Sequence, residues 1–509
     1  MTFRISTTPL ATAVRMPEPR SGGMASELLG AFVPAPGIAP LLERLNAPGA
    51  LAVTTGQQPA LFTGPAYTIH KALSAAALAA RLEAAWERPV VPIFWIAGDD
   101  HDFAEANHVA WLGGDGSVHE ARLRERGADA AMLPLYREPV GAEVADAIAA
   151  LRATLPASNY RDETIDWIAR HFQPEVSIAA AFGAAIAELL APLGVICLDS
   201  THRAFKCAAA PLLLRALREA SGLEAGLVRR AATLSGDGRD AGVAVGDGAT
   251  LVMLEARQGR DRLVRDGDAF VTRRSGERFS LPQIEAIAAA EPERLSANVL
   301  LRPVIESALL PTVAYAAGPG ELRYLALAEA LYAPLDVVRQ TPVPRWSGMV
   351  VDARIDRIMK KFNIEPEGLT ADAAALETRI VRARMPEEAD LELGGLRASF
   401  ADQFAALRTT ASRVDPTVIR TVATQRDRAL AGVERIERKL VAALRRRMQV
   451  ELGQLAVARA AIAPGGKPQE RVLSAVSFLA RHGPPLLDAE LAAANAWYAG
   501  ALEGARVSA

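Results

Sequence analysis

The sequence predicts an α/β protein with a doubly wound parallel sheet, connecting insertions and an α-helical coiled-coil arm. Three observations predict this. Short apolar runs alternate with helical patterns from about residue 50 to 340, and such alternation is typical of parallel sheets. Two of these runs, residues 51–53 and 90–97, end in turns rich in polar side chains and glycine. Residues from about 370 to 460 are instead rich in Ala, Leu, Glu and Arg, with apolar positions every three or four residues.

Length and composition limit the classes of protein to consider. At 509 residues, half of them hydrophobic and 23% charged, the chain can form two or three globular domains. The formal net charge of −2 provides no broad basic surface for nucleic acid or an anionic membrane. Charges and prolines interrupt every apolar run before the roughly 18–20 residues of a membrane span, and residues 1–20 lack a signal-peptide pattern. Two cysteines are too few for a disulfide framework or a structural zinc site. We expect a cytoplasmic protein without nucleic-acid or membrane partners.

The elements of the core follow from the apolar patterns. Strands are expected at residues 50–55, 90–97, 195–199, 250–254, 312–316 and 336–338. Helices are expected at residues 67–86, 177–190, 202–220 and 321–331. Residues 249–281 read as an antiparallel meander because short alternating runs are separated by Gly-Arg-Asp and Asp-Gly-Asp turns. We therefore predict a core over residues 1–365, with insertions near 120–165 and 225–295.

The arm is expected over residues 366–462 as two long antiparallel helices with a break at Asp415-Pro416. An ordinary helical bundle packed on the core is the alternative. Residues 463–509 follow as a helical segment with enough apolar side chains to pack back on the core.

The first candidate ligand loop lies at residues 54–71. A buried strand runs into a loop bent by Gly56 and Gly64, and a helix follows, a place where free backbone N–H groups attract anions. Polar and titratable side chains lie along this loop and the first turns of the helix: Gln57, Gln58, Thr63, Tyr67, His70 and Lys71. Lys71 is one of only six lysines among 57 basic residues, which indicates that a compact ammonium is needed there.

The second candidate segment follows the apolar run 90–97. Asp99, Asp100, His101 and Asp102 come at the carboxyl end of this strand, where α/β sheets place catalytic groups. We expect the clustered carboxylates to raise at least one carboxyl pKa and the pKa of His101, which makes an acid/base pair. Two alternatives are a metal site, although the spacing fits no common zinc pattern, and simple capping of a helix at 103–110 by Asp99 or Asp102. Asn107 and His108 lie close behind.

The third candidate segment covers residues 298–321. Arg302 could bind an anion bidentately, or pair with Glu306 or Glu321. The strand at 312–316 opens into Gly318-Pro319-Gly320-Glu321 at a helix start, a second place for a phosphate or carboxylate.

These segments resemble the bacillithiol-biosynthesis cysteine-adding enzyme family, the BshC-type cysteine ligases. The resemblance spans essentially the whole chain and is carried by TTGQQPALFTGPAYTIHKA at 54–72, VPIFWIAGDDHDFAEANH at 91–108, NVLLRPVIESALLPTVAYAAGPGE at 298–321 and PGGKPQERV at 464–472. It implies a Rossmann-like core, a coiled-coil domain that forms a homodimer, and addition of cysteine to glucosaminyl-malate. Similarity of that core to class I aminoacyl-tRNA synthetases further implies activation of the cysteine carboxylate by ATP, with Mg²⁺ accompanying the nucleotide and no protein-bound metal.

The chain departs from these patterns in two respects. It has no second lysine signature of the KMSKS kind, and Asp99 stands where the family is expected to have Glu. The segment near Lys467 is either a second nucleotide contact or a turn between helices.

Roles for the candidate residues follow from their chemistry together with the resemblance. We expect Asp100 or Asp102, with His101, to deprotonate the acceptor amine. Lys71, His70 and the N–H groups near Gly64 would stabilise phosphate or oxyanion charge, and Arg302 would hold the malate carboxylates. The alternatives are another ATP-dependent ligase or nucleotidyltransferase with a different amine acceptor, and a non-catalytic nucleotide-binding coiled-coil scaffold.

Overall fold

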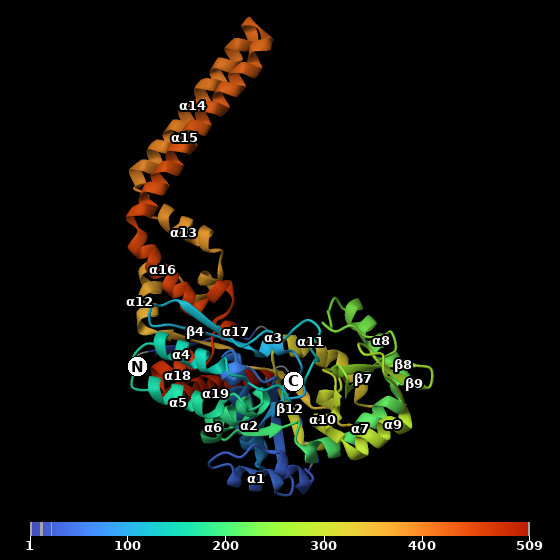
Figure 1. Cartoon of the computed structure of the whole chain (residues 1–509). Helices are drawn as coiled ribbons and strands as arrows, with labels where there is room; N and C mark the ends of the chain where they lie inside the picture. The colour runs from blue at the N-terminus through green and yellow to red at the C-terminus, as the bar shows by residue number, and fades with distance from the viewer. Residues whose placement is uncertain (1–2, 11–13, 22, 507–509) are drawn as a thin grey trace. The chain divides into compact units, whose positions relative to one another are not determined.

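The computed structural model describes residues 3–10, 14–21 and 23–506 and divides into two compact units (Figure 1). The first unit contains the residues up to Val350 together with those from Gln469 onward, and the second runs from Val351 to Pro468. Within the described part of the chain, no helix has the length and apolar character required to cross a membrane.

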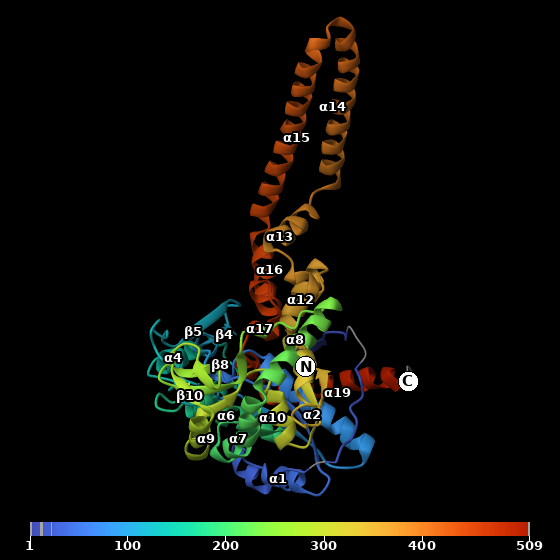
Figure 2. The ribbon, with the colours of Figure 1, turned by 90° about the vertical axis from the view of Figure 1, so that its right-hand side faces the viewer.

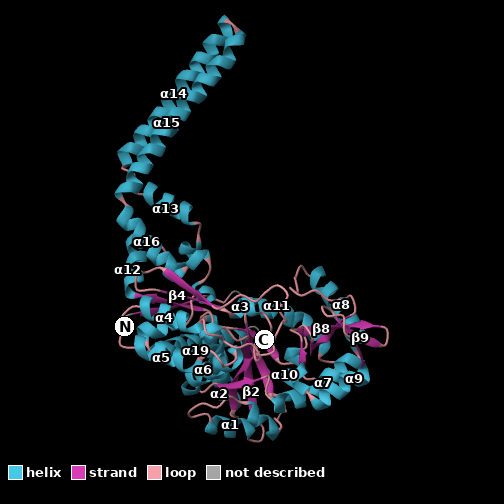
Figure 3. Ribbon diagram, viewed as in Figure 1, coloured by secondary structure: helices cyan, strands magenta, loops and turns pink. Residues whose placement is uncertain are grey.

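A parallel five-stranded sheet, in the order β13-β12-β2-β3-β6, forms the centre of the first unit. Its strand β2 is labelled in Figure 3, where strands are magenta. Its strands are β2 (Leu51–Gln57), β3 (Val90–Ile96), β6 (Ile196–Asp199), β12 (Thr312–Ala317) and β13 (Thr341–Pro344). Chain order reverses between β2 and β12, which creates a topological switch point at the carboxyl ends of these two strands. The Rossmann-like, doubly wound sheet is therefore confirmed.

The prediction of a strand at residues 336–338 is wrong. Asp336 takes a left-handed backbone conformation with φ of 56°, and Val338 is largely exposed, so this segment is a turn. The last strand is instead β13, which includes Pro342 and Pro344 and pairs only with β12. Proline has no backbone N–H to donate, and it is tolerated in an edge strand because one side of that strand has no partner strand to accept a hydrogen bond.

Helices cover the sheet where the apolar patterns predicted them. They are α2 (Tyr67–Trp86), α6 (Ile178–Leu190), α7 (Arg203–Arg218) and α11 (Pro319–Ala328). Helix α2 is buried along most of its length because it lies between the sheet and α19 (Pro485–Arg506). The remaining elements of this part are β1 (Phe3–Thr7), α1 (Ala39–Asn46), α8 (Ala220–Gly236), α10 (Arg302–Leu309), α17 (Gln469–Val472) and α18 (Val476–His482).

The two insertions form separate pieces. The second insertion is an antiparallel sheet in the order β10-β9-β8-β7-β11, which confirms the meander and adds two strands to it. Its strands are β7 (Ala249–Ala256), β8 (Gly259–Asp266), β9 (Ala269–Thr272), β10 (Arg278–Ser280) and β11 (Leu295–Ala297), with α9 (Leu281–Ala290) between the last two. The region predicted as the first insertion, near 120–165, contains β5 (Val118–Arg122), α4 (Val144–Thr154) and the start of α5 (Arg161–His171). The elements α3 (Phe103–Ala106) and β4 (His108–Leu112) precede it.

The second unit is helical. Its elements are α12 (Ala353–Phe362), α13 (Ala373–Arg382), α14 (Glu387–Val414), α15 (Ile419–Arg447) and α16 (Gln449–Ile462), while β14 (Gly348–Asp352) spans the boundary. Figure 2 shows α14 and α15 as an antiparallel pair, joined at the predicted break where Asp415 accepts a hydrogen bond from Thr417 N–H. The unit begins before the predicted boundary at 366 because α12 packs on α16.

Candidate functional site

The three candidate segments meet at the carboxyl edge of the parallel sheet. Strand β2 pairs with β12 on one side and with β3 on the other, so all three polar turns leave the sheet together. Ala97 N–H donates to Gln57 O at 3.0 Å, and Thr55 Oγ1 donates to Ala316 O at 2.8 Å. The three segments therefore share one edge of the sheet, around the switch point.

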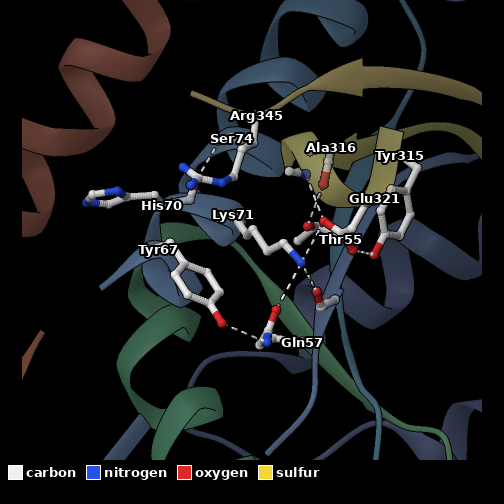
Figure 4. A network of polar contacts seen from close by, with 12 residues as sticks. Thr55, Gln57, Tyr67, His70, Lys71, Ser74, Tyr315, Ala316, Glu321 and Arg345 are labelled. Atoms are coloured by element: carbon white, nitrogen blue, oxygen red, sulfur yellow. Dashed lines mark hydrogen bonds and ion pairs between the residues drawn. The ribbon is translucent and has the colours of Figure 1, made fainter. Parts of the chain in front are cut away.

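Lys71 links the first segment to the third (Figure 4). Its Nζ lies 2.6 Å from Gly56 O, 3.0 Å from Gln57 Oε1 and 2.7 Å from Glu321 Oε2, and the residue is only 4% exposed. Burial lowers the pKa of Lys71, and the Glu321 carboxylate opposes this shift. Since an ammonium has three N–H groups and each already has an acceptor, Lys71 positions this loop rather than offering a free donor to a ligand.

Glu321 organises the third segment around the same ion pair. Its carboxylate accepts hydrogen bonds from Gly318 N–H at 2.7 Å and from Tyr315 Oη at 2.8 Å. Burial alone would raise the pKa of Glu321, but Lys71 and the Gly318 N–H hold it below its usual value. On the other side of Lys71, Gln57 Nε2 donates to Tyr67 Oη at 3.1 Å, and burial raises the pKa of Tyr67 to about 12. Gly320 remains exposed.

Gly56 is required for packing rather than for approach of a ligand. A Cβ atom at this position would lie 2.8 Å from both the Cβ and the carbonyl oxygen of Trp95 on the neighbouring strand. Carbon atoms pack at about 3.5–4.0 Å. The glycine therefore allows β2 and β3 to pair at their carboxyl ends.

The expectation of free backbone N–H groups near Gly64 is wrong. Gly64 N–H donates to Leu61 O at 2.9 Å, and Ala66 N–H, at the start of α2, donates to Leu473 O at 2.8 Å. Ser474 Oγ also donates to Phe62 O at 3.1 Å. The segment after α17 thus covers the loop and the start of this helix, and Thr63 is buried with it.

His70 lies in a buried network apart from the partners of Lys71 (Figure 4). Its Nδ1 is 2.7 Å from Glu470 Oε2 and its Nε2 is 3.3 Å from Glu490 Oε1, and Arg345 Nη1 donates to Glu470 at 2.9 Å. Burial alone would lower the pKa of His70, but the two carboxylates raise it to about 9. His70 therefore ties α2 to the C-terminal helices, and the structure does not place it with Lys71 toward a ligand.

The aspartates of the second segment are held in three different ways. Asp99 accepts a hydrogen bond from Lys206 Nζ, which also donates to Leu295 O at 3.0 Å. Asp100 Oδ1 accepts from the backbone N–H groups of His101 at 2.7 Å and Asp102 at 3.1 Å. Asp102 caps α3 by accepting from the N–H of Glu105 at 3.1 Å, so the capping alternative is correct for this residue.

The residues that follow these aspartates contact their own surroundings. Asn107 Nδ2 donates to Arg124 O at 3.0 Å, and His108 Nδ1 lies 3.1 Å from Ala104 O. Glu105 is the acid of this stretch whose pKa is raised, first by burial and then by Asp102 and Asp100. Nearby, Gln58 Nε2 is buried and has no hydrogen-bond partner among the described residues.

The predicted rise in the pKa of His101 is wrong. Its Nδ1 lies 3.2 Å from Arg260 Nη1 and its Nε2 lies 3.3 Å from Arg274 Nη2. Burial and then the Arg260 charge lower the pKa to about 4, and the opposing effect of Asp100 is smaller. The imidazole is therefore neutral at pH 7 and is a weak base. The arginines responsible come from the antiparallel sheet, far along the chain from His101.

A cavity of about 280 Å³ lies beside this segment. Its polar lining includes Asp99, Asp100, His101, Lys206, Arg260, Arg262 and Arg302. The Arg302 guanidinium donates to Glu306 at 3.1 Å and to Tyr324 Oη at 3.0 Å, so the ion-pair alternative is correct while the side chain also borders the cavity. Burial raises the pKa of Glu306 to about 7.

Sequence reasoning missed several residues of this cavity. Lys206 is, like Lys71, one of the six lysines, and both are buried beside a carboxylate, so the rarity of lysine was the signal for it. Arg260 and Arg262 alternate with Asp261 and Leu263 along β8, a pattern that indicates a face with two arginines. Nothing in the local sequence indicates that this face turns toward His101.

Two other features lie outside this cavity. A larger cavity of about 770 Å³, bordered by residues of α5, α6, α18 and α19, contains none of the predicted residues. Near Lys467, residues Pro464–Gly466 form a 3₁₀ turn, which follows α16 and precedes α17 in the chain. In the described parts of the chain, no three His, Cys, Asp or Glu side chains are grouped as metal ligands would be.

Comparisons with known proteins cover both units. Residues 35–345 match the family model described as "Bacillithiol biosynthesis BshC, N-terminal Rossmann-like domain", and residues 348–497 match the corresponding "C-terminal coiled-coil domain". The chain is 32% identical over 446 residues to the "Putative cysteine ligase BshC" of Solibacter usitatus, which covers 87% of this chain and 82% of the relative. The protein of that name from Koribacter versatilis is 31% identical over 456 residues, covering 89% and 84% respectively.

Proposed function

Because the chain belongs to the bacillithiol-biosynthesis BshC family, we propose that it is a ligase that joins the carboxyl group of L-cysteine to the amine of glucosaminyl-malate. The observation that carries this proposal is the match of both domain models, which together extend over residues 35–345 and 348–497. The names of the relatives support the cysteine donor. The cationic cavity at the carboxyl edge of the sheet supports an acidic acceptor.

The ligase reaction needs an activated carboxyl group, because a carboxylate is a poor electrophile. In this proposal ATP transfers either an adenylyl group to the cysteine carboxylate, with release of pyrophosphate, or a phosphoryl group, with release of ADP. AMP or phosphate then leaves when the amine attacks. The switch point between β2 and β12 supports this role, since doubly wound folds bind nucleotides at that position. Lys71 and Glu321 hold the two strand ends there in a fixed relation.

The acceptor amine must lose a proton as the amide forms. We assign this proton to Asp100, which borders the cavity and whose Oδ2 accepts no hydrogen bond from a described residue, while its Oδ1 is occupied by two backbone N–H groups. Asp102 is less suited because it caps α3 and is exposed. His101, neutral at pH 7, serves as a hydrogen-bonding wall of the cavity rather than as the base.

The proposal is tested by incubating the full chain with cysteine, glucosaminyl-malate and ATP and measuring thiol and nucleotide products by mass spectrometry. We expect an amide of cysteine that depends on ATP, and a loss of rate of about 10²–10⁴-fold in Asp100→Asn. Asp102→Asn is the matched control, with a small effect on the rate. Absence of the amide from folded protein would refute the substrate assignment.

We also propose that the coiled-coil arm forms a homodimer. In the α14–α15 hairpin, Val422 and Val433 are buried, whereas other apolar side chains remain exposed: Leu391, Leu396, Leu407, Ile436 and Leu440. Exposed apolar residues on a helical pair fit contact with a second copy of the chain. Light scattering should give twice the chain mass, and Ile436→Glu with Leu440→Glu should reduce it to one. A monomeric mass for the unaltered chain would contradict this assignment.

A further inference from the structure

The cavity beside His101 contains arginines without carboxylate partners. Arg260 donates to Ser296 Oγ at 2.9 Å and Ala297 O at 2.7 Å, and its remaining contact is His101. The Arg262 side chain makes no hydrogen bond or ion pair with any residue that the structure describes. This distinguishes the two residues from most arginines of the first unit, which pair with Asp or Glu.

Both arginines of β8 border the same cavity. Residues two apart on a strand share a face, so Arg260 and Arg262 lie on one side of β8 and both border the cavity. Asp261 faces the other way and accepts hydrogen bonds from the backbone N–H groups of Arg274 and Ser275, at 2.7 Å and 3.2 Å. It therefore does not neutralise the pair inside the cavity.

Among the described residues, no carboxylate pairs with the guanidinium group of Arg260 or Arg262, although Asp100 also lines the cavity. Burial, and then the neighbouring charges of Arg273 and Arg260, lower the pKa of Arg262. Across the cavity, Lys206 is neutralised by Asp99. Half-buried guanidinium groups that repel one another are stable together only when an anion or solvent screens them.

A further donor borders the same cavity. Trp95 is 4% exposed, and its indole Nε1 has no hydrogen-bond partner among the described residues. A buried N–H group without a partner is destabilising, and a ligand acceptor oxygen that reached it would remove this penalty.

We infer that Arg260 and Arg262 are the residues that recognise a dicarboxylate in this cavity and so determine which acceptor the protein selects. The planar guanidinium fork matches a carboxylate bidentately, and two forks on one strand face match two carboxylates of a small diacid. A volume of about 280 Å³ lies just below the roughly 300–1,000 Å³ of sites for drug-sized ligands, so it suits the acidic end of an acceptor rather than a whole nucleotide. The inference that this diacid is the malate end of the acceptor rests on the proposed function.

The experiment measures binding directly and does not need ligase activity. The full chain is titrated calorimetrically with L-malate, succinate, acetate and pyrophosphate at constant ionic strength. We expect both diacids to bind and acetate to bind at least tenfold more weakly. We expect Arg262→Gln to weaken L-malate binding at least tenfold and Arg262→Lys to recover part of the loss. Arg257→Gln is the matched control, since it removes the same charge from the exposed end of the same sheet and should bind L-malate unchanged.

Three results would overturn the inference. They are no diacid binding by the folded chain, equal L-malate binding by the unaltered chain and Arg262→Gln, and binding of pyrophosphate in preference to the diacids, which would assign the arginines to nucleotide phosphates. In the ligase reaction, Arg262→Gln should raise the KM for glucosaminyl-malate at least tenfold while the KM for cysteine stays constant. Diacid binding without ligation would uphold this inference and refute the proposed function. Ligation in which Arg262→Gln leaves the KM for glucosaminyl-malate unchanged would uphold the proposed function and refute this inference.

Discussion

The ion pair between Lys71 and Glu321 should be a main support of the sheet edge that carries the candidate site. Lys71→Met keeps the length of the side chain but removes the ammonium and its three acceptor contacts, at 2.6, 3.0 and 2.7 Å. The Glu321 carboxylate, only 16% exposed, then stays behind without its main partner. Removal of one partner of a buried ion pair costs about 3–5 kcal/mol, so we expect a loss of this size in the free energy of unfolding.

The assay is urea denaturation followed by tryptophan fluorescence. All six tryptophans lie outside residues 351–468, so their emission reports the first unit alone. The double variant Lys71→Met with Glu321→Gln should lose about 1–3 kcal/mol less than the sum of the single variants, because neither leaves an unpaired charge. Arg229→Met, which removes an exposed cation from α8, is the control and should change stability by less than about 0.5 kcal/mol. A loss below about 1 kcal/mol for Lys71→Met, or additive single losses, would refute this role.

Three further predictions concern the same edge of the sheet. The pKa of His101 is about 4 in the folded chain and about 6.5 in the unfolded chain, so the free energy of unfolding should rise with pH between these two values. The pKa can be measured by NMR titration, and a value at or above 6.5 would contradict the contact with Arg260. The pKa of His70 is about 9 in the folded chain, so its stabilising effect should be fully present below pH 6.5 and should be lost as the pH rises through 9. His70→Gln should abolish this pH dependence, which is measured as the change in melting temperature with pH. Gly56→Ala should destabilise the first unit by about 1–3 kcal/mol through its contact with Trp95, whereas Gly222→Ala, where nothing lies within 4 Å of the added carbon, should not destabilise it; equal effects in thermal denaturation would contradict the packing role of Gly56.

The elements that depend on local pattern could be predicted from the sequence. Helix α2 begins and ends at the predicted residues 67 and 86, and strands β2, β3 and β12 lie within one or two residues of their predicted bounds. Most of their buried side chains are apolar, so the apolar pattern marks these elements. Strand β13 was missed because Pro342 and Pro344 argue against a strand unless its edge position is known.

Contacts between distant segments could not be predicted from local pattern. The cover on the start of α2 comes from Leu473 and Ser474, and the low pKa of His101 comes from Arg260 and Arg274. Such pairs become neighbours only through the packing of whole elements. The three motif segments share one edge because parallel strands deliver their carboxyl ends there, whatever the sequence between them.

Isotopic labelling tests the proposed ligase activity most directly. The full chain is incubated with ATP, glucosaminyl-malate and cysteine labelled with ¹⁸O in both carboxylate oxygens, and the products are analysed by mass spectrometry. ATP-dependent ligation predicts an amide product that keeps one ¹⁸O, with the other ¹⁸O in AMP or in phosphate. If the amide forms while AMP and phosphate stay unlabelled, activation by ATP is contradicted. If folded protein forms no amide at all, the ligase assignment is contradicted.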